Sequence, residues 1–272
     1  MSTVASAGAP PGTAVADALL IQLIGAVAVS RSGQVLPVAE VGSRKARTLL
    51  ALLAVSGGQV PLDRIVAAVW GEAPPRRPAA NLATLVSRLR GALGAAAIVG
   101  DRTGYRLGDG VLVDLRQGAA LVDEAEQRLA SVPALALILA RKAAGLFGGG
   151  LALAEYPEAE WAEPARTSQS LLVRRARHTI ATAALEIGDV RAAVDAAEAA
   201  IATDAFDELA CRMLMRAHRA AGEPARALLA YQHFSGTLAT ELGVDPGPAT
   251  RAVYAAILRD TAATRELPRP AR

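Results

Sequence analysis

Residues 44–94 read RKARTLLALLAVSGGQVPLDRIVAAVWGEAPPRRPAANLATLVSRLRGALG and contain three successive apolar patterns with helical spacing. Ser43 is a good N-cap for the first predicted helix, which Gly57 ends, and Gly71 ends the second. A stiff loop at 72–78, with three prolines, leads into the third. The third helix has a single apolar face, formed by Leu82, Leu85, Val86, Leu89 and Leu93.

The segments on either side favour β-structure. Residues 19–41 contain short runs rich in Val and Ile around the turn Ser30–Gly33, which is a hairpin signal. Residues 97–115 contain two further apolar runs around Asp101–Gly104 and predict a second hairpin. Strands, three helices and a hairpin in this order predict a winged helix-turn-helix domain of α+β structure at residues 19–110.

The rest of the chain reads as almost entirely helical. Gly188-Asp189 and Gly222-Glu223 lie 34 residues apart, which is the period of tetratricopeptide-like helix pairs. We therefore expect a mainly α protein with an all-α, tetratricopeptide-like domain at 111–262 and flexible tails at 1–18 and 263–272. The candidate helices are 116–130, 133–147, 159–187, 189–202, 206–221, 223–242 and 248–260.

Composition supports close-packed helices and a reducing compartment. Of the 272 residues, 52% are hydrophobic but only 3% aromatic, and 63 are alanine. The single cysteine, Cys211, excludes an intrachain disulfide, and we expect it in the core. The longest apolar stretch, 19–29, is too short to span a bilayer, and residues 1–18 have no Lys or Arg for a secretory signal. We therefore expect a cytoplasmic protein.

Charge is divided unevenly along the chain. Residues 42–107 carry ten Lys and Arg but three Asp and Glu, a net charge of +7, whereas residues 111–272 carry a net charge of −2. A basic module joined to a near-neutral one indicates a polyanion-binding domain with an interaction domain. A solvated surface in an Arg-rich protein is the alternative.

The polar face of the third helix carries the chemistry of a DNA reader. Asn81, Thr84 and Arg88 lie opposite the apolar face; Asn matches adenine and Arg matches guanine in the major groove. Ser87 and Arg90 flank them, while Arg76 and Arg77 precede the helix N-terminus, where phosphate is favoured. An ordinary solvated face is the competing interpretation.

Enzyme activity is disfavoured by the motifs. Gly148-Gly149-Gly150 lacks the Lys-Ser/Thr of a phosphate loop, and nucleophile-elbow and zinc-protease motifs are absent from the sequence. No Cys/His cluster has metal-ligand spacing, so no metal or cofactor is expected. The acidic run is expected to be a solvated loop and helix start; it comprises Glu155, Glu158, Glu160 and Glu163.

Two blocks of sequence together resemble one family. Residues 44–94 followed by IVGDRTGYRL resemble the OmpR-type winged helix of the Streptomyces antibiotic regulatory protein family. The run from Gly188, which closes with ELGVDPGPATRAVYAAIL, is similar to that family's bacterial transcriptional activation domain. The resemblance covers roughly residues 19–260.

The resemblance implies an activator of secondary-metabolite genes that binds direct repeats, self-associates on DNA and recruits RNA polymerase. It also implies that the loop from Gly71 to Pro78 contacts polymerase. By position it implies base reading by Asn81, Thr84 and Arg88. At the wing tip, Asp101 stands where relatives commonly have Arg, which puts wing insertion in doubt. A repressor with the same DNA contacts and a helical interaction scaffold are the alternatives. Expected backbone contacts are Arg44, Lys45, Arg47, Arg76, Arg77, Ser87 and Arg90; expected wing residues are Arg102, Thr103, Tyr105 and Arg106.

Overall fold

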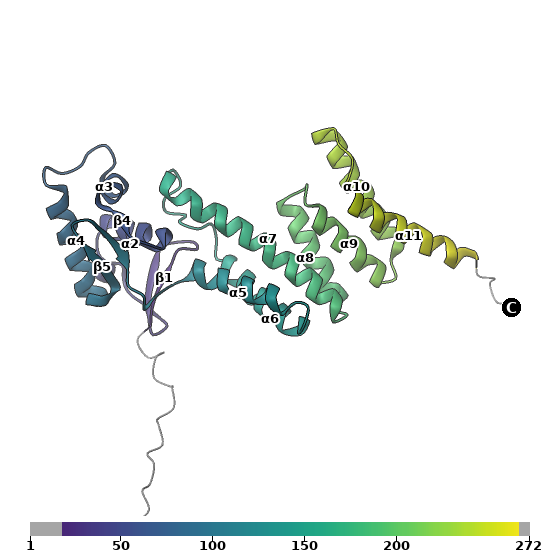
Figure 1. The fold of residues 1–272 in the computed structure, drawn as a ribbon, viewed down its shortest axis with the longest axis horizontal. Coiled ribbons are helices and arrows are strands. Elements are labelled where there is room, and N and C mark those ends of the chain that lie inside the picture. Colours follow the sequence, from purple (N-terminus) through teal and green to yellow (C-terminus); the bar gives the residue numbers. More distant parts are fainter. Residues whose placement is uncertain (1–17, 267–272) are drawn as a thin grey trace, which may run out of the picture. The chain divides into compact units, whose positions relative to one another are not determined.

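The computed structural model describes residues 18–266, which form two compact units. Unit 1 extends to Gln117 and also includes Gly149–Gln169, whereas unit 2 comprises Gly118–Gly148 and the chain from Ser170 onward (Figure 1). Unit 1 combines helices with small sheets and unit 2 is helical, so the protein is mainly α, as predicted.

A four-stranded sheet opens unit 1, in the order β3-β2-β1-β7. Strand β1 pairs antiparallel with β2 and parallel with β7, and β2 forms a hairpin with β3. The loop of that hairpin is Ser32-Gly33, both with positive φ, as the predicted turn requires. A short helix, α1, then follows where strand was expected. The bounds are β1 Leu19–Gln22, β2 Ala28–Arg31, β3 Gln34–Val35, α1 Val38–Val41 and β7 Val111–Val113.

Three helices form the centre of unit 1, and their limits follow the caps read from the sequence. The hydroxyl of Ser43 accepts a hydrogen bond from the Ala46 N–H, and Gly57 ends the first helix in the left-handed conformation. Residues 49–54 of that helix are all buried, because it is surrounded by the other elements of the unit. The helices are α2 Arg44–Ser56, α3 Leu62–Trp70 and α4 Pro78–Leu93.

A three-stranded sheet has the order β4-β6-β5, and two of its strands, β5 and β6, follow α4. Strands β5 and β6 form the predicted second hairpin, in which Asp101 is paired with Gly104. Strand β4, between α2 and α3, pairs with β6 and ties the hairpin to the helices. The bounds are β4 Val60–Pro61, the 3-10 helix η1 Ala95–Ala97, β5 Ile98–Asp101 and β6 Gly104–Leu107.

Residues 149–169 return to unit 1, which therefore extends beyond the boundary expected at residue 110. The Leu153 N–H donates to the Leu23 carbonyl at 2.7 Å, and Ile24 forms a β-bridge with Ala152. The approach is so close that a Cβ on Gly25, whose φ is +81°, would lie 2.8 Å from the Gly149 oxygen. Local sequence patterns do not report such long-range packing. The segment contains the 3-10 helix η2 Glu160–Ala162.

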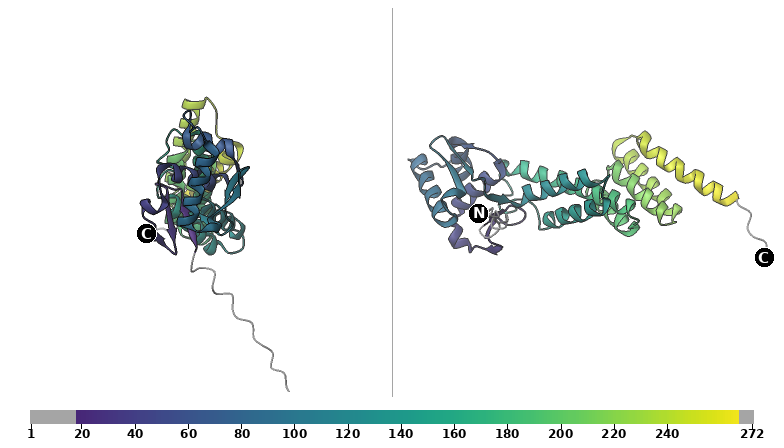
Figure 2. Two further views of the ribbon diagram at one scale, coloured as in Figure 1. Left: turned by 90° about the vertical axis from the view of Figure 1, so that its left-hand side faces the viewer. Right: turned by 60° about the horizontal axis from the view of Figure 1, so that its bottom comes forward.

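Unit 2 consists of helices packed mainly through alanines. Contacts join α8 to α9 and α9 to α10, and α11, yellow in Figure 2, contacts both α9 and α10. Gly188 and Gly222, the two glycines of the 34-residue spacing, both have positive φ, 79° and 75°, at equivalent turns between helices. The helices are α5 Asp114–Arg128, α6 Pro133–Phe147, α7 Glu163–Glu186, α8 Val190–Thr203, α9 Glu208–Ala220, α10 Pro224–Leu242 and α11 Pro248–Glu266; the unit boundary falls within α5 and α7.

The ends of the chain differ in part from the expected tails. Helix α11 takes in residues 263–266 of the expected C-terminal tail. The remainder of that tail, 267–272, and residues 1–17 of the N-terminal tail lie outside the described residues. Within residues 18–266, no helix combines the length and apolarity needed to cross a bilayer.

Candidate nucleic-acid interface

The three predicted base-reading residues of α4 line one shallow hollow of about 310 Å³ on unit 1. All three are exposed, because the opposite face of α4 is buried through Leu82 and its successors at helical spacing. The hollow lies between α4 and three neighbouring segments, which are the start of α2, the end of α3 and the loop that joins α3 to α4. Its lining comprises Lys45, Trp70, Pro75, Asn81, Thr84, Leu85 and Arg88.

Each polar group in the hollow keeps capacity for an outside partner. The Thr84 hydroxyl donates to the Ala80 carbonyl at 3.0 Å, so its oxygen can still accept a hydrogen bond. Asn81 and Arg88 supply an amide and a guanidinium, which match the edges of adenine and guanine. The arrangement therefore offers donors and acceptors in one place.

Trp70 is a member of this hollow that the sequence reasoning missed. The Lys45 ammonium lies 5.7 Å from the centre of the Trp70 ring, within cation–π range. The contact holds a positive charge beside the predicted base-reading residues and joins α2 to α3. The signal available in the sequence was an aromatic residue directly before the helix-ending Gly71, in a chain that is only 3% aromatic.

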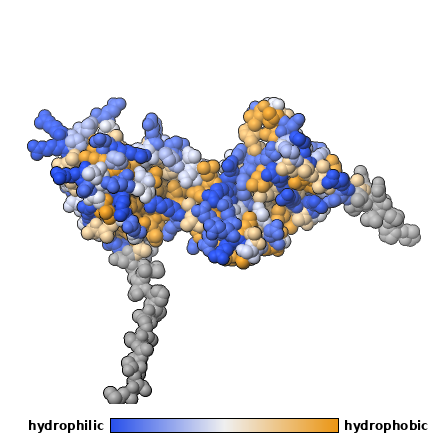
Figure 3. Space-filling model, viewed as in Figure 1, coloured by the Kyte–Doolittle hydropathy of each residue, from blue (hydrophilic) through white to orange (hydrophobic). Residues whose placement is uncertain are grey.

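The residues expected to contact the DNA backbone differ in how exposed their side chains are. Arg44, Arg76, Arg77 and Ser87 are exposed, and Arg77 is the N-cap residue of α4. Figure 3 shows hydrophilic side chains projecting from the part of unit 1 that carries the α3–α4 loop. Arg47 is only half-exposed, and its guanidinium donates to the Gly42 carbonyl at 3.3 Å.

The turn of the β5–β6 hairpin is held by Asp101. Both the backbone N–H and the hydroxyl of Thr103 donate to Asp101 Oδ1 at 2.8 Å. These bonds, the backbone one first, lower the pKa of the Asp101 carboxyl, so the group is ionised near neutral pH. Arg102 is exposed at the tip of this turn.

Two expected wing residues face inward or are paired. Tyr105 is only 6% exposed and belongs to the core of unit 1, because β6 lies between β4 and β5. The Arg106 guanidinium donates to Asp109 at 2.6 Å and to the Leu107 carbonyl at 3.0 Å. Tyr105 thus stabilises the hairpin, and Arg106 has an acidic partner within the protein.

Arg90 has a different environment from the phosphate-facing one expected of it. Its Nε donates to the Ile98 carbonyl at 2.9 Å and one amino group donates to the Gly100 carbonyl at 3.2 Å. Its guanidinium also lies 5.9 Å from the centre of the Tyr105 ring. Helical spacing placed Arg90 on the flank of α4 but could not show that the hairpin covers that flank.

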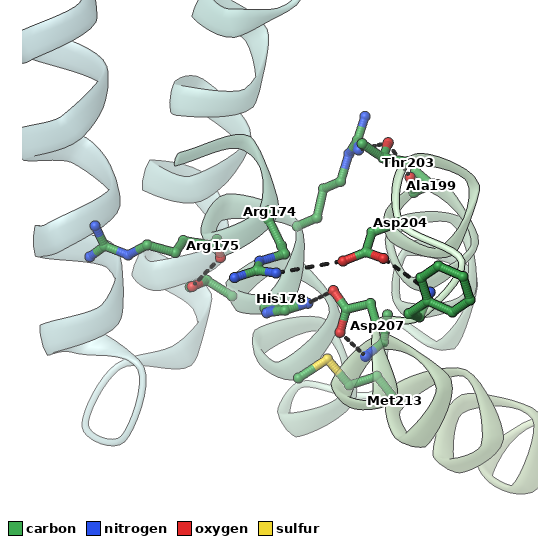
Figure 4. A network of polar contacts seen from close by, with 12 residues as sticks. Arg174, Arg175, His178, Ala199, Thr203, Asp204, Asp207 and Met213 are labelled. Carbon is green, nitrogen blue, oxygen red and sulfur yellow. Dashed lines mark hydrogen bonds and ion pairs between the residues drawn. The ribbon is translucent and has the colours of Figure 1, made fainter. Parts of the chain in front are cut away.

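A separate polar network in unit 2 serves packing (Figure 4). His178 Nε2 of α7 lies 2.6 Å from Asp207 Oδ2, and Asp207 Oδ1 accepts from the Ala210 N–H at the start of α9. Beside it, Arg174 pairs with Asp204 at 3.6 Å. These contacts connect α7 to the turn between α8 and α9. Within residues 18–266, no group of three or more His, Cys, Asp or Glu side chains could hold a metal ion.

Comparison with known proteins places this chain among bacterial regulators. Residues 113–258 match the family described as the bacterial transcriptional activator domain. The chain is 35% identical over 265 residues to regulatory protein AfsR of Streptomyces griseus, with 96% of this chain covered; it spans only 26% of that relative's length. It is 28% identical to transcriptional regulatory protein MoaR1 of Mycobacterium tuberculosis, covering 90% of this chain and 80% of MoaR1.

A solved structure agrees with these matches over both units. The structure of Mycobacterium tuberculosis EmbR in complex with a low affinity phosphopeptide has a TM-score of 0.78 to this chain and 27% sequence identity. The alignment covers 90% of this chain and 66% of the EmbR chain.

Proposed function

Because the chain belongs to the bacterial transcriptional activator domain family, within the Streptomyces antibiotic regulatory protein type, we propose that it is a sequence-specific DNA-binding activator of transcription. Its similar proteins are transcriptional regulators. The single observation that carries the proposal is the hollow on unit 1, where Asn81, Thr84 and Arg88 lie exposed beside the Lys45 charge.

In this proposal α2, α3, α4 and the β5–β6 hairpin form a winged helix-turn-helix. Helix α4 enters the major groove, where Asn81 and Arg88 read base edges and Thr84 contacts a base or a phosphate. The net charge of +7 on residues 42–107 supplies affinity for the DNA backbone. The proposed backbone contacts are Arg44, Lys45, Arg47, Arg76, Arg77 and Ser87, with Arg102 and Thr103 at the wing.

One winged helix reads too short a segment for strong discrimination, so we infer that two protomers bind side by side on direct repeats. Repeats about one helical turn apart, ~10–11 bp, would present both α4 helices to one side of the duplex. The 72–78 loop and the helical unit 2 are then available to contact RNA polymerase. The targets that the family implies are secondary-metabolite genes, read in the cytoplasm.

Selection from random duplex DNA with the full chain tests the proposal. The selected site should bind the wild-type chain, and Arg88→Ala should lose about 1–3 kcal/mol and relax preference at one base pair. Arg191→Ala is the matched control, because this arginine lies on α8 of unit 2 and its side chain is 92% exposed. Failure to enrich any sequence, or equal losses in both variants, would refute the proposal.

Transcription with purified polymerase separates the two regulatory outcomes. An activator raises transcript from a promoter that carries the selected site, whereas a repressor with the same DNA contacts lowers it. A substitution in the 72–78 loop, Glu72→Ala, should lower the transcript more than it lowers DNA affinity. A proportional loss of both would remove the polymerase role of the loop.

A further inference from the structure

We infer that Arg90 is a positioning residue, not a DNA contact: it fixes the β5–β6 hairpin on α4, so that the wing meets DNA at a set distance from the base-reading residues. This inference rests on the proposed function, in which α4 and the hairpin turn both touch the duplex. It assigns to one side chain the relative placement of those two elements.

The guanidinium of Arg90 contacts both strands of the hairpin. On β5 its Nε and an amino group donate to the carbonyls of Ile98 and Gly100, at 2.9 and 3.2 Å. On β6 it lies 5.9 Å from the centre of the buried Tyr105 ring. A planar fork that uses two donors fixes an angle as well as a distance, which a point charge such as lysine does not.

Gly100, whose carbonyl accepts from Arg90, lies close to the turn of the hairpin and is rigidly connected to it. At Gly100, whose φ is +133°, an added Cβ would lie 2.2 Å from the Gly104 oxygen, so the two strands approach as closely as a glycine allows. The next residue, Asp101, holds the turn through Thr103. A displacement at Gly100 is therefore carried to Arg102 at the tip.

The competing interpretation is that Arg90 neutralises a phosphate directly. In the structure two of its nitrogen atoms already donate within the protein, and Arg90 is only half-exposed. Arg88, two residues earlier, lies exposed in the hollow instead. The two arginines of one helix thus have separate tasks.

Amide hydrogen exchange of the full chain without DNA tests whether Arg90 holds the hairpin on α4. In Arg90→Gln, exchange of the hairpin amides at 100–105 should rise about tenfold, the effect of losing roughly one net hydrogen bond, while the amides of α2 stay protected. Arg90→Lys should give an intermediate increase. Arg64→Gln, which removes an exposed charge from α3, is the control and should match the wild type. Unchanged hairpin exchange in Arg90→Gln overturns the inference.

Salt dependence of DNA binding then separates positioning from phosphate contact. One lost phosphate contact lowers the slope of log K against log salt by about 0.9. If Arg90 acts only through the wing, then Arg90→Gln, Arg102→Gln and the double variant should all lower the slope by the same amount, about 0.9. A decrease of about 1.8 in the double variant, or no decrease in Arg102→Gln, overturns the inference. A wild-type chain that binds no DNA refutes the proposed function instead, and the exchange measurement still decides whether Arg90 holds the hairpin.

Discussion

Replacing Asp114 with alanine should unfold unit 1 at a much lower denaturant concentration. Asp114 is the first residue of α5 and only 3% exposed. Its carboxylate accepts from the backbone N–H groups of Leu23 and Ile24, at 2.9–3.0 Å, and of Leu115 at 2.7 Å. The group therefore joins the end of β1 to the start of α5, two places that are about ninety residues apart in sequence.

The expected loss in the free energy of unfolding follows from the backbone N–H groups that are left without an acceptor. Each buried N–H that loses its partner costs about 1–3 kcal/mol. Removal of the buried charge and relaxation of Leu115 toward water offset part of the total, so we expect a loss of about 3–5 kcal/mol. That is a large part of the roughly 5–15 kcal/mol that stabilises an ordinary domain. Asp114→Asn keeps one acceptor oxygen, and we expect a smaller loss of about 2 kcal/mol.

Urea unfolding followed by tryptophan fluorescence measures this loss in unit 1 alone. Both tryptophans of the chain, Trp70 and Trp161, belong to unit 1. With a denaturant slope of roughly 2 kcal/mol/M, the midpoint of Asp114→Ala should fall by about 2 M. Asp109→Ala, which removes an exposed acid paired with Arg106, should shift it by less than about 0.5 M. A wild-type midpoint for Asp114→Ala, or an equal shift for Asp109→Ala, would refute the reasoning.

Three further expectations concern other parts of the chain. A fragment of residues 18–110 lacks β7 and the 149–169 segment, so its Trp70 fluorescence should report unfolding at lower urea than in the full chain; an unchanged midpoint would argue against that packing. Burial raises the pKa of the Cys211 thiol to about 12, so Ellman's reagent at pH 8 should label the chain rapidly only after urea unfolds it, and fast native labelling would contradict this. The hydrogen bond from Thr250 lowers the pKa of Glu208 below its ordinary value of 4.5. The ionised carboxylate therefore stabilises the fold at pH values above 4.5, and this stabilisation is lost as the pH falls through the lowered pKa. After correction for intrinsic rates, Glu208→Gln should therefore speed hydrogen exchange in α11 relative to wild type at pH 7 but much less at pH 3. An equal effect at both pH values would contradict this expectation.

Features with a local cause could be predicted from the sequence. Ser43 and Gly57 delimit α2 because caps and left-handed glycines act on their own neighbours. The polar face of α4 was identified because helical spacing alone sorts Asn81, Thr84 and Arg88 from the buried leucines. Whether that face reads DNA remains a prediction.

Features that depend on distant partners could not be predicted. Asp114 resembles any acid at a helix start until the fold brings the N–H groups of Leu23 and Ile24, which directly follow β1, to its carboxylate. Arg90 resembles a phosphate contact, and Arg106 an exposed wing residue, until the structure shows the hairpin carbonyls beside Arg90 and Asp109 beside Arg106. In each case the side-chain type was visible, but its partner lay in an element that only the fold brings near.

The return of residues 149–169 to unit 1 has a consequence for synthesis on the ribosome. The segment supplies the Leu153 and Tyr156 contacts of the unit 1 core, yet it is translated after α5 and α6 of unit 2. At roughly 5–20 residues per second, several seconds pass between translation of Gln117 and of Gln169. During that interval α2, α3 and α4 lack the packing layer that residues 149–169 supply. A messenger truncated between the codons for residues 117 and 149 would therefore yield unit 1 without this layer, and we expect that product to be less stable than the complete unit.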